Sequence, residues 1–353
     1  MAIDESITDE QAESSDELYQ RFSFTADKGQ EPLRIDKFLM NRIENATRNK
    51  LQQAINAGLV LVNGKEVRQN YKIKAGDQII IYSDLSPEST DVVPEEMALN
   101  IHFEDEDILV INKPPGMVVH PGSGNYSGTL LNGVAHYLQH EDPSITEQKL
   151  PRFGLVHRID KNTSGLLVLA KNDFAMRQLA KQFYDHTVKR NYVALVWGDV
   201  ENESGTIRAH VGRNLRHRKL FEAYPEGDHG KEAITHYRVL ERFNYVTLVE
   251  CVLETGRTHQ IRVHMKYIGH PLFNDDFYGG DKIVKGTIYS KYKQFVDNCF
   301  SICPRQALHA KTLGFIHPTK GEEVFFNTEI PADIAQVIEK WRNYSKARPG
   351  DAS

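Results

Sequence analysis

The sequence predicts an α+β fold in which a large mixed domain follows a small N-terminal α/β domain. The first reason is length, because 353 residues exceed the roughly 200 to 250 that one compact core usually holds. The second reason is the order of the predicted elements after residue 99, where strands and helices mix irregularly. Regular alternation would have favoured a doubly wound parallel sheet instead.

Composition and turn residues divide the chain into five parts. The first 20 residues contain seven acids and no Lys or Arg, and removing these charges takes the net charge from −5 to +2. A solvated, disordered segment is the expected structure of such a run. We therefore predict an acidic tail at 1–24, a small domain at 25–84, a polar, proline-containing linker at 85–98, a main domain at 99–344 and a C-terminal tail at 345–353.

The small domain is predicted from two helical patterns followed by three strands. RIDKFLMNRI (34–43) and TRNKLQQAINAG (47–58) place apolar residues at helical spacing, and the second ends in a glycine stop. LVLVNGKEV (59–67) reads as two strands around an Asn-Gly hairpin turn, and IKAGDQIIIY (73–82) as a further strand. This order resembles the S4 RNA-binding domain along its whole length.

The small domain is also the most basic part of the chain. Residues 33–82 hold nine Lys and Arg against four acids. A solvated helix face explains most isolated basic runs, but here the S4-like pattern favours an RNA phosphate backbone as the partner. The candidate contacts are Arg34, Lys37, Arg48 and Lys50.

The main domain is predicted from apolar periodicity. Strands are expected at 108–111, 166–169, 192–197, 235–240 and 245–252. Helices are expected near 129–139, 173–184, 258–268 and 332–343, with Thr258 as the N-cap of the third.

Several classes of protein are excluded by what the sequence lacks. It has no dinucleotide-binding glycine motif, no P-loop and no zinc-protease motif, so we expect no nucleotide cofactor. The three cysteines, Cys251, Cys299 and Cys303, have no partners at zinc-site spacing, so ordinary buried thiols are expected and no metal. No apolar run reaches the length of a membrane span, and the acidic N-terminus is unlike a signal peptide, which favours a cytoplasmic protein.

The segment GLVHRIDKNTSGLLVLAK (154–171) contains a single carboxylate, Asp160. Asp160 lies between Arg158 and Lys161, just before an apolar strand. Nearby cations lower an Asp pKa, so this carboxylate suits a nucleophile or an ion-pair anchor better than a general acid. This segment alone does not decide between these two roles.

Three further polar residues are candidates for the site because they lie on or next to predicted strands and helices. Lys113 follows a strand, Tyr192 opens one, and Arg262 lies on a predicted helix from which it could reach a carboxylate across a cleft. Taken singly, each has a plain structural explanation: a surface lysine, a core tyrosine and a salt-bridge partner.

Together these segments resemble the RluA-type pseudouridine synthases over about residues 25–340. The matching motifs are INKPPGMVVHPG (111–122), HRIDKNTSGLLVLAK (157–171), KRNYVALVWG (189–198), LETGRTHQIRVHM (253–265), HPLFNDDFYGG (270–280) and RQALHAKTLGFIHP (305–318). Two positions depart from the family pattern: Ile159 replaces Leu, and Asn274 stands where Gly is common, which leaves the geometry of that turn open. The resemblance implies a mixed, mostly antiparallel central sheet with flanking helices.

The resemblance also implies roles for the candidate residues. Asp160 would be the essential carboxylate, acting on the ribose, on the uracil ring or through a glycal. Arg262 would pair with Asp160 and keep it ionised. Tyr192 would pack against a uracil flipped out of its helix. Lys113 would have a structural or RNA-near role, and no cofactor would be required.

The implied substrate is 23S ribosomal RNA or its precursor, with the helix 69 stem-loop as the expected site and a monomeric enzyme. A tRNA or another rRNA site is the main alternative. A non-catalytic ribosome-assembly factor would be expected to have lost Asp160, Tyr192 or Arg262, and a hydrolase would need a second suitably placed carboxylate. Further RNA contacts are expected from Arg158 and from a basic loop that contains Arg213, Arg216, Arg218 and Lys219.

Overall fold

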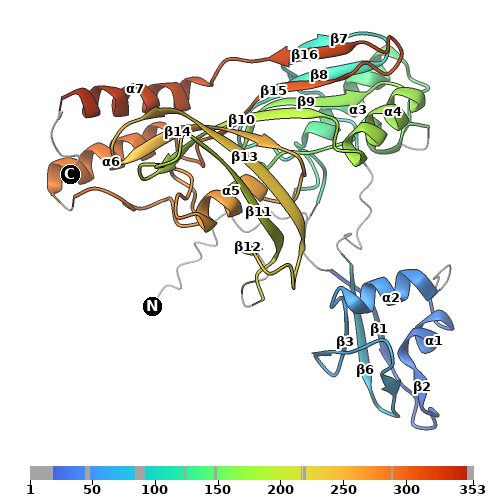
Figure 1. The fold of residues 1–353 in the computed structure, drawn as a ribbon. Coiled ribbons are helices and arrows are strands. Elements are labelled where there is room, and N and C mark those ends of the chain that lie inside the picture. The colour runs from blue at the N-terminus through green and yellow to red at the C-terminus, as the bar shows by residue number, and fades with distance from the viewer. Residues whose placement is uncertain are drawn as a thin grey trace, which may run out of the picture. The chain divides into compact units, whose positions relative to one another are not determined.

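The computed structural model describes residues 19–43, 48–83, 92–122, 125–146, 149–215, 217, 220–287 and 289–347. Most of the predicted N-terminal tail, residues 85–91 of the predicted linker and the end of the predicted C-terminal tail lie outside these residues. The chain divides into two compact units (Figure 1). The first falls within Met1–Asp91 and Pro121–Tyr126, and the second within Val92–His120 and Ser127–Ser353.

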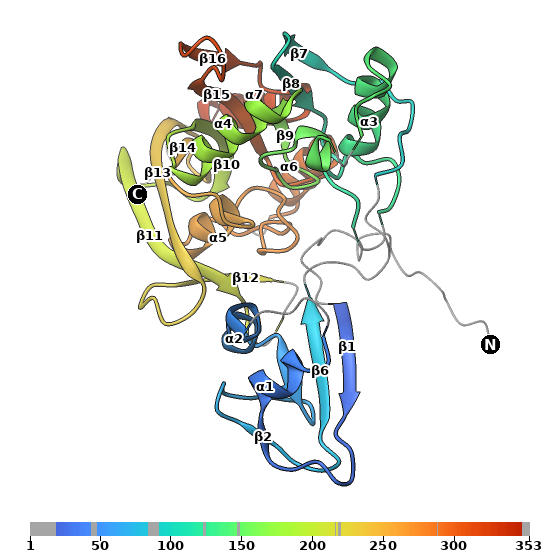
Figure 2. The ribbon, with the colours of Figure 1, turned by 90° about the vertical axis from the view of Figure 1, so that its right-hand side faces the viewer.

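The N-terminal unit contains two helices against a small antiparallel sheet (Figure 2). Its elements are β1 (Tyr19–Thr25), β2 (Leu33–Arg34), α1 (Ile35–Met40), α2 (Arg48–Asn56), β3 (Val60–Val62), β4 (Lys65–Glu66), β5 (Lys72–Ile73) and β6 (Gln78–Ser83). The sheet order is β1-β6-β3-β4, and β2 pairs with β5. Ile35, Phe38, Leu51 and Ile55, four of the residues that predicted the helices, are buried in one core.

Strand β1 corrects the predicted extent of the acidic tail. Residues 19–25, which we expected to belong largely to a disordered segment, pair antiparallel with β6. Phe22 and Phe24 alternate with exposed residues and pack against the core of the unit. Two phenylalanines at strand spacing are enough to anchor an edge strand, and the acidic composition upstream masked this signal.

The main unit is built on a ten-stranded sheet with helices on both faces. Its strands are β7 (Ile101–Glu104), β8 (Ile108–Lys113), β9 (Ser164–Ala170), β10 (Lys189–Trp197), β11 (Ser204–Arg213), β12 (Phe221–Tyr224), β13 (Lys231–Arg242), β14 (Val246–Leu253), β15 (Leu308–Ile316) and β16 (Glu323–Asn327). Its helices are α3 (Leu130–Glu141), α4 (Asp173–Tyr184), α5 (Gln260–Tyr267), α6 (Ser290–Ile302) and α7 (Ala332–Lys346).

The sheet is mixed but mostly antiparallel, which confirms the predicted α+β class. The order is β12-β11-β13-β14-β10-β15-β9-β8-β7, with β16 paired to β15, and only the β9–β15 pair among the described strands is parallel. Alternating side chains of β10 separate two cores. Ala194 and Val196 share a core with α3 and α5, whereas Val193 and Leu195 share one with α6 and α7.

The predicted elements are present, but the list was incomplete. Helix α4 has the predicted bounds, and α7 runs to Lys346, so the predicted C-terminal tail starts too early. In the main unit, strands β7, β11, β12, β15 and β16 and helix α6 were not predicted. Among the described helices, none combines the length and apolar character needed to cross a membrane.

Candidate active site

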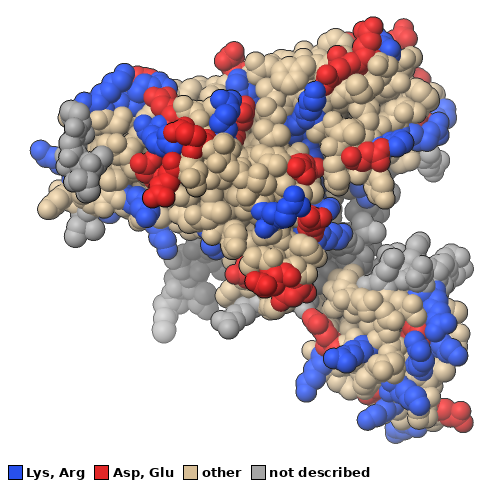
Figure 3. Space-filling view, viewed as in Figure 1, with Lys and Arg blue, Asp and Glu red and all other residues tan. Residues whose placement is uncertain are grey.

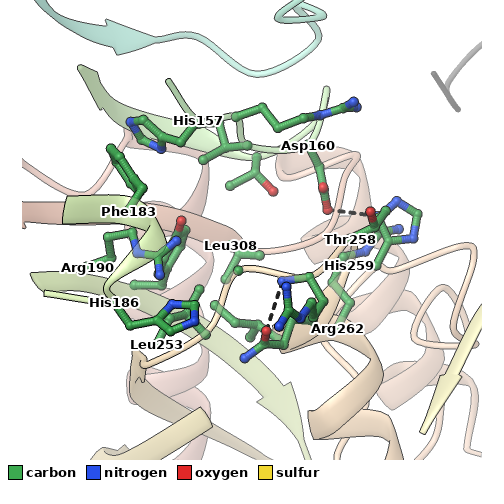
Figure 4. Close-up of a pocket in the computed structure, with 18 of the residues that line it drawn as sticks. His157, Asp160, Phe183, His186, Arg190, Leu253, Thr258, His259, Arg262 and Leu308 are labelled. Atoms are coloured by element: carbon green, nitrogen blue, oxygen red, sulfur yellow. Dashed lines mark hydrogen bonds and ion pairs between the residues drawn. The ribbon is translucent and has the colours of Figure 1, made fainter. Parts of the chain in front are cut away.

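Asp160, Tyr192 and Arg262 line one pocket of about 640 Å³ in the main unit (Figure 4). Its walls come from the loop before β9, the end of α4, the start of β10, the β14–α5 connection and Leu308 of β15. These segments are far apart in sequence, and the sheet brings them together. The three residues predicted to be catalytic therefore share a single cavity.

The loop that carries Asp160 is held by two buried cations. Lys113, fully buried at the end of β8, donates from Nζ to the carbonyl oxygens of Lys161 at 2.8 Å, Pro114 at 2.7 Å and Met117 at 2.9 Å. From the other side, Arg305 donates to the carbonyl of Asn162 at 2.9 Å. The reading of Lys113 as a surface residue is wrong, and its contacts give it a structural role.

Arg262 joins Asp160 to a second carboxylate that is completely buried. Its Nη1 lies 3.1 Å from Asp160 Oδ2, while its Nε and Nη2 donate to the two oxygens of Asp275 at 2.8 and 2.9 Å. The side chains of Arg262, Asp275 and Asp160 are 3%, 0% and 24% exposed. The bidentate contact with Asp275 fixes the guanidinium plane, so that the remaining N–H group points at Asp160.

The charges around Asp160 keep it ionised. Burial by itself raises the pKa of Asp160, but the charges of His259 and Arg262 and the hydrogen bond from Arg262 outweigh burial, so that the pKa lies below its ordinary value. The pKa of Arg262 is raised, because Asp275 and Asp160 outweigh the effect of its burial. At neutral pH the pocket thus presents a carboxylate that can act as a nucleophile or a base.

Helix α5 begins differently from the prediction. We expected Thr258 to cap it, but the helix starts at Gln260, and His259 occupies the N-cap in a left-handed conformation (φ 53°) without a side-chain cap bond. The buried Gln260 holds this turn, since its side-chain oxygen accepts from Thr255 Oγ1 at 2.8 Å and from the Arg257 N–H at 3.0 Å. His259 instead contacts the Tyr278 hydroxyl through Nδ1 at 2.7 Å.

Tyr192 forms part of the pocket wall. It lies on β10, opposite Cys251 of β14, and is 6% exposed. Burial raises its pKa, so its hydroxyl is protonated at neutral pH. Leu253, Ile261 and Leu308 add apolar surface to the same cavity. This environment suits a planar base better than a charged group.

The sequence reasoning missed Asp275, although it quoted the segment HPLFNDDFYGG in which Asp275 lies. The position that left the turn geometry open, Asn274, adopts a left-handed conformation (φ 56°), which Asn tolerates better than most residues. Its side chain donates to the Cys303 carbonyl at 2.7 Å. This turn places Asp275 against Arg262.

The predicted RNA contacts differ in their surroundings. Arg34 and Arg48 both contact the buried Asp36, with Oδ2 2.8 Å from Arg34 Nη2 and 3.2 Å from Arg48 Nε, so they also stabilise the N-terminal unit. Lys37 is exposed, and Lys and Arg cover much of the visible face of this unit (Figure 3). Arg158 is exposed and lines the pocket.

The expected basic loop is shorter than predicted. Arg213 ends strand β11 and lies over the ring of Phe221, with 5.4 Å from Cζ to the ring centroid. Arg216, Arg218, Lys219 and the side chain of Lys50 lie outside the described residues. Their predicted RNA contacts stay predictions.

The cysteines are buried thiols, as expected from their isolation in the sequence. Burial raises the pKa values of Cys251, Cys299 and Cys303 to about 12. Elsewhere in the unit, Asp105, Asp107 and His317 bring possible ligand atoms within 4.8 Å of one another. Lys320 Nζ already lies 2.8 Å from Asp105 Oδ2 and supplies the positive charge there.

Comparison with known proteins agrees with this geometry. Residues 107–267 match the family described as RNA pseudouridylate synthase, and residues 33–79 match the S4 domain. An uncharacterized RNA pseudouridine synthase of Bacillus subtilis (strain 168) is 45% identical over 322 residues, which cover 91% of this chain and 98% of that protein. The chain belongs to the RNA pseudouridylate synthase family. It is an RNA pseudouridine synthase that also carries an S4 domain.

Other relatives confirm the resemblance to the RluA-type enzymes. A protein of Neisseria meningitidis serogroup B named ribosomal large subunit pseudouridine synthase D is 42% identical over 310 residues, which cover 88% of this chain and 79% of that protein. Among solved structures, human RNA pseudouridylate synthase domain containing 4 matches with a TM-score of 0.53 at 22% identity, covering 69% of this chain and 93% of that one. At this identity the match supports the fold alone.

Proposed function

We propose that this synthase isomerises specific uridines of 23S ribosomal RNA, with Asp160 as the essential carboxylate and the helix 69 stem-loop as its target. The observation that carries the catalytic part is the ionised Asp160, which pairs with an Arg262 fixed by Asp275 and lines a pocket of about 640 Å³. The substrate part is supported by the similarity to proteins named ribosomal large subunit pseudouridine synthase D.

The reaction needs a group that attacks or deprotonates while the base is held. The N1–C1′ bond of uridine breaks, a C5–C1′ bond forms, and the proton lost from C5 is balanced by one gained at N1. Asp160 assists this exchange by attack on the ribose, by attack on the uracil ring or through a glycal. Arg262 keeps Asp160 ionised, and Tyr192 packs against the detached uracil while it rotates.

RNA binding is shared between the two units in this proposal. The exposed Lys37 and the other cations of the S4 domain contact phosphates away from the reacting base, and Arg158 contacts the RNA at the mouth of the pocket. The protein acts as a monomer on the 23S rRNA or its precursor. We place this activity in the cytoplasm, with the ribosomal RNA.

The test is a map of pseudouridines in total RNA from cells with and without the gene. We expect pseudouridines of helix 69 to disappear from 23S rRNA and to return when the gene is restored, but not when it carries Asp160→Asn. Loss at a tRNA or another rRNA position would contradict the target while keeping the chemistry. Unchanged maps would contradict the proposed substrate altogether.

A further inference from the structure

Arg190 is a buried cation that has no hydrogen-bond or ion-pair partner within the described part of the chain. It lies on β10, two residues before Tyr192, and is 8% exposed. No described carboxylate, carbonyl or hydroxyl accepts a hydrogen bond from its guanidinium, and its Nε is fully buried without a partner. By contrast, Arg262 and Arg305, equally buried, each make an ion pair. Guanidinium groups of this kind are normally paired, because burial of a lone charge is costly.

The described surroundings of Arg190 supply an aromatic ring but no counter-charge. The ring of Phe183 lies beside it, with 5.6 Å from Cζ to the ring centroid. The absence of a side chain at Gly256 leaves room for the guanidinium, since a Cβ there would lie 2.7 Å from Arg190 Nη1. Burial and the charge of Arg190 lower the pKa of His157 to about 3, so this neighbour is neutral at pH 7.

Arg190 and Asp160 lie on different sides of the same pocket. In Figure 4, Arg190 lies with His157 and Phe183 on one side, and Asp160 lies with Arg262 on the other. A substrate that fills the pocket therefore reaches both groups. Uracil and ribose are neutral at pH 7, and the phosphodiester is the anionic part of RNA. A phosphate also matches the planar fork of a guanidinium.

We propose that Arg190 binds a backbone phosphate next to the flipped uridine and so fixes the register of the RNA strand relative to Asp160. This inference rests on the proposed function, because it takes RNA to be the molecule in the pocket. Arg190 is then held in place before the RNA arrives, and the phosphate completes a charge-assisted hydrogen bond with it. In the free enzyme the unpaired charge costs stability, and the RNA supplies the compensation.

The experiment removes the guanidinium of Arg190 and the charge of the phosphate one at a time. The full-length enzyme, Arg190→Met and Arg190→Lys are assayed on a stem-loop RNA in which each phosphate around the target uridine is replaced in turn by a neutral methylphosphonate. For wild type we expect kcat/KM to fall about ten- to a hundredfold at one linkage. Arg190→Met should show a loss of similar size on unmodified RNA and no further loss at that linkage. Arg190→Lys, which keeps the charge, should be more active than Arg190→Met and should again lose some activity when that linkage is a methylphosphonate.

Two controls separate this contact from a structural role. Arg190→Met should melt at the wild-type temperature or above, because it replaces an unpaired buried charge by an apolar side chain. Arg177→Met removes an exposed cation of α4 that pairs with Asp173 and does not line the pocket, and it should leave the methylphosphonate profile unchanged. A marked fall in melting temperature for Arg190→Met would show that Arg190 is structural and would overturn the proposal.

The remaining outcomes are equally decisive. The proposal fails if Arg190→Met keeps the wild-type sensitivity at every linkage, or if no linkage affects the wild-type enzyme. If wild type forms no pseudouridine in a helix 69 stem-loop, the proposed substrate fails instead, and the same scan is run on the RNA that cellular mapping identifies. The two failures are therefore distinguishable.

Discussion

The substitution Asp160→Asn separates the chemistry of the carboxylate from its contribution to folding. The amide is nearly isosteric, and its oxygen can still accept a hydrogen bond from Arg262 Nη1, which lies 3.1 Å from Asp160 Oδ2. It carries no negative charge and is a much poorer nucleophile and base. Pseudouridine formation should therefore disappear, a larger loss than the roughly 10²- to 10⁴-fold expected when only a general acid or base is removed.

The structure limits how much stability this substitution removes. Taking one partner from a buried ion pair costs about 3 to 5 kcal/mol when the other charge is left alone. Arg262 is not left alone, because Asp275 still binds it through two hydrogen bonds. Asp160 is also partly exposed, and the neutral amide is easier to bury. We therefore expect Asp160→Asn to lower the free energy of unfolding by at most about 1 to 2 kcal/mol.

Asp275→Asn provides the matched comparison. This carboxylate is fully buried and makes two of the three contacts with Arg262, so its loss should cost more than that of Asp160, up to about 3 to 5 kcal/mol, although Asp160 still pairs with Arg262. Both variants are compared with wild type by chemical denaturation, by RNA-binding titration and by pseudouridine formed in a stem-loop transcript. Activity of Asp160→Asn within tenfold of wild type, with folding and binding intact, would remove Asp160 from the chemistry. A stability loss larger than that of Asp275→Asn would refute the reasoning about Arg262.

Three other predictions concern charged residues of the two units. Arg262→Lys keeps the charge but cannot donate to Asp160 and Asp275 in one plane, so turnover should fall about a hundredfold or more at unchanged RNA affinity; near-wild-type turnover would contradict this role. Burial alone raises the pKa of Asp36, but hydrogen bonds from Arg34, Gln52 and Arg48 lower it to about 2. The lowered pKa should therefore add about 2 kcal/mol to the free energy of unfolding of the N-terminal unit above pH 4, and this gain should be lost as the pH falls towards 2. Hydrogen exchange in α1 and α2 measures it, and the difference in protection between wild type and Asp36→Asn should shrink over that range. Lys37→Gln removes an exposed cation and should reduce the salt slope of RNA binding by about 0.7 to 0.9 without changing the melting temperature, whereas an unchanged slope would exclude a phosphate contact.

Local sequence patterns predicted those helices and strands in which buried apolar residues recur at regular spacing. Helix α4 has the predicted bounds, and the apolar residues of β9 are all buried, as a continuous apolar run suggests. Strand β11 was missed because alternating exposure mixes polar and charged residues into it. Helix α6 could have been predicted, since its apolar residues lie at helical spacing and pack in one core. The order of the sheet joins strands that are distant in sequence, so no local pattern could have predicted it.

The candidate site was predicted only in part because its partners are distant. Asp160 stood out by its charged neighbours, but the contact with Arg262 spans 102 positions and came from the family resemblance. Asp275 looked like one of two acids in a turn, and its burial depends on how that turn packs. Lys113 was misread for the same reason, since the three carbonyls that hold its ammonium become neighbours only after β8 and the Asp160 loop have met.

Two buried arginines of the pocket have different roles, one in chemistry and one in binding. Arg262 is saturated by two carboxylates before any substrate arrives, so RNA gains little by contacting it, and its contribution lies in the orientation and charge of Asp160. Arg190, on the other side, has no hydrogen-bond or ion-pair partner among the described residues and gains one only when an anion enters. The free enzyme therefore keeps its reactive carboxylate fixed and its binding cation unpaired. Because catalysis depends on holding the reacting groups in place, RNA bound through Arg190 would bring the uridine to a carboxylate that needs no further rearrangement.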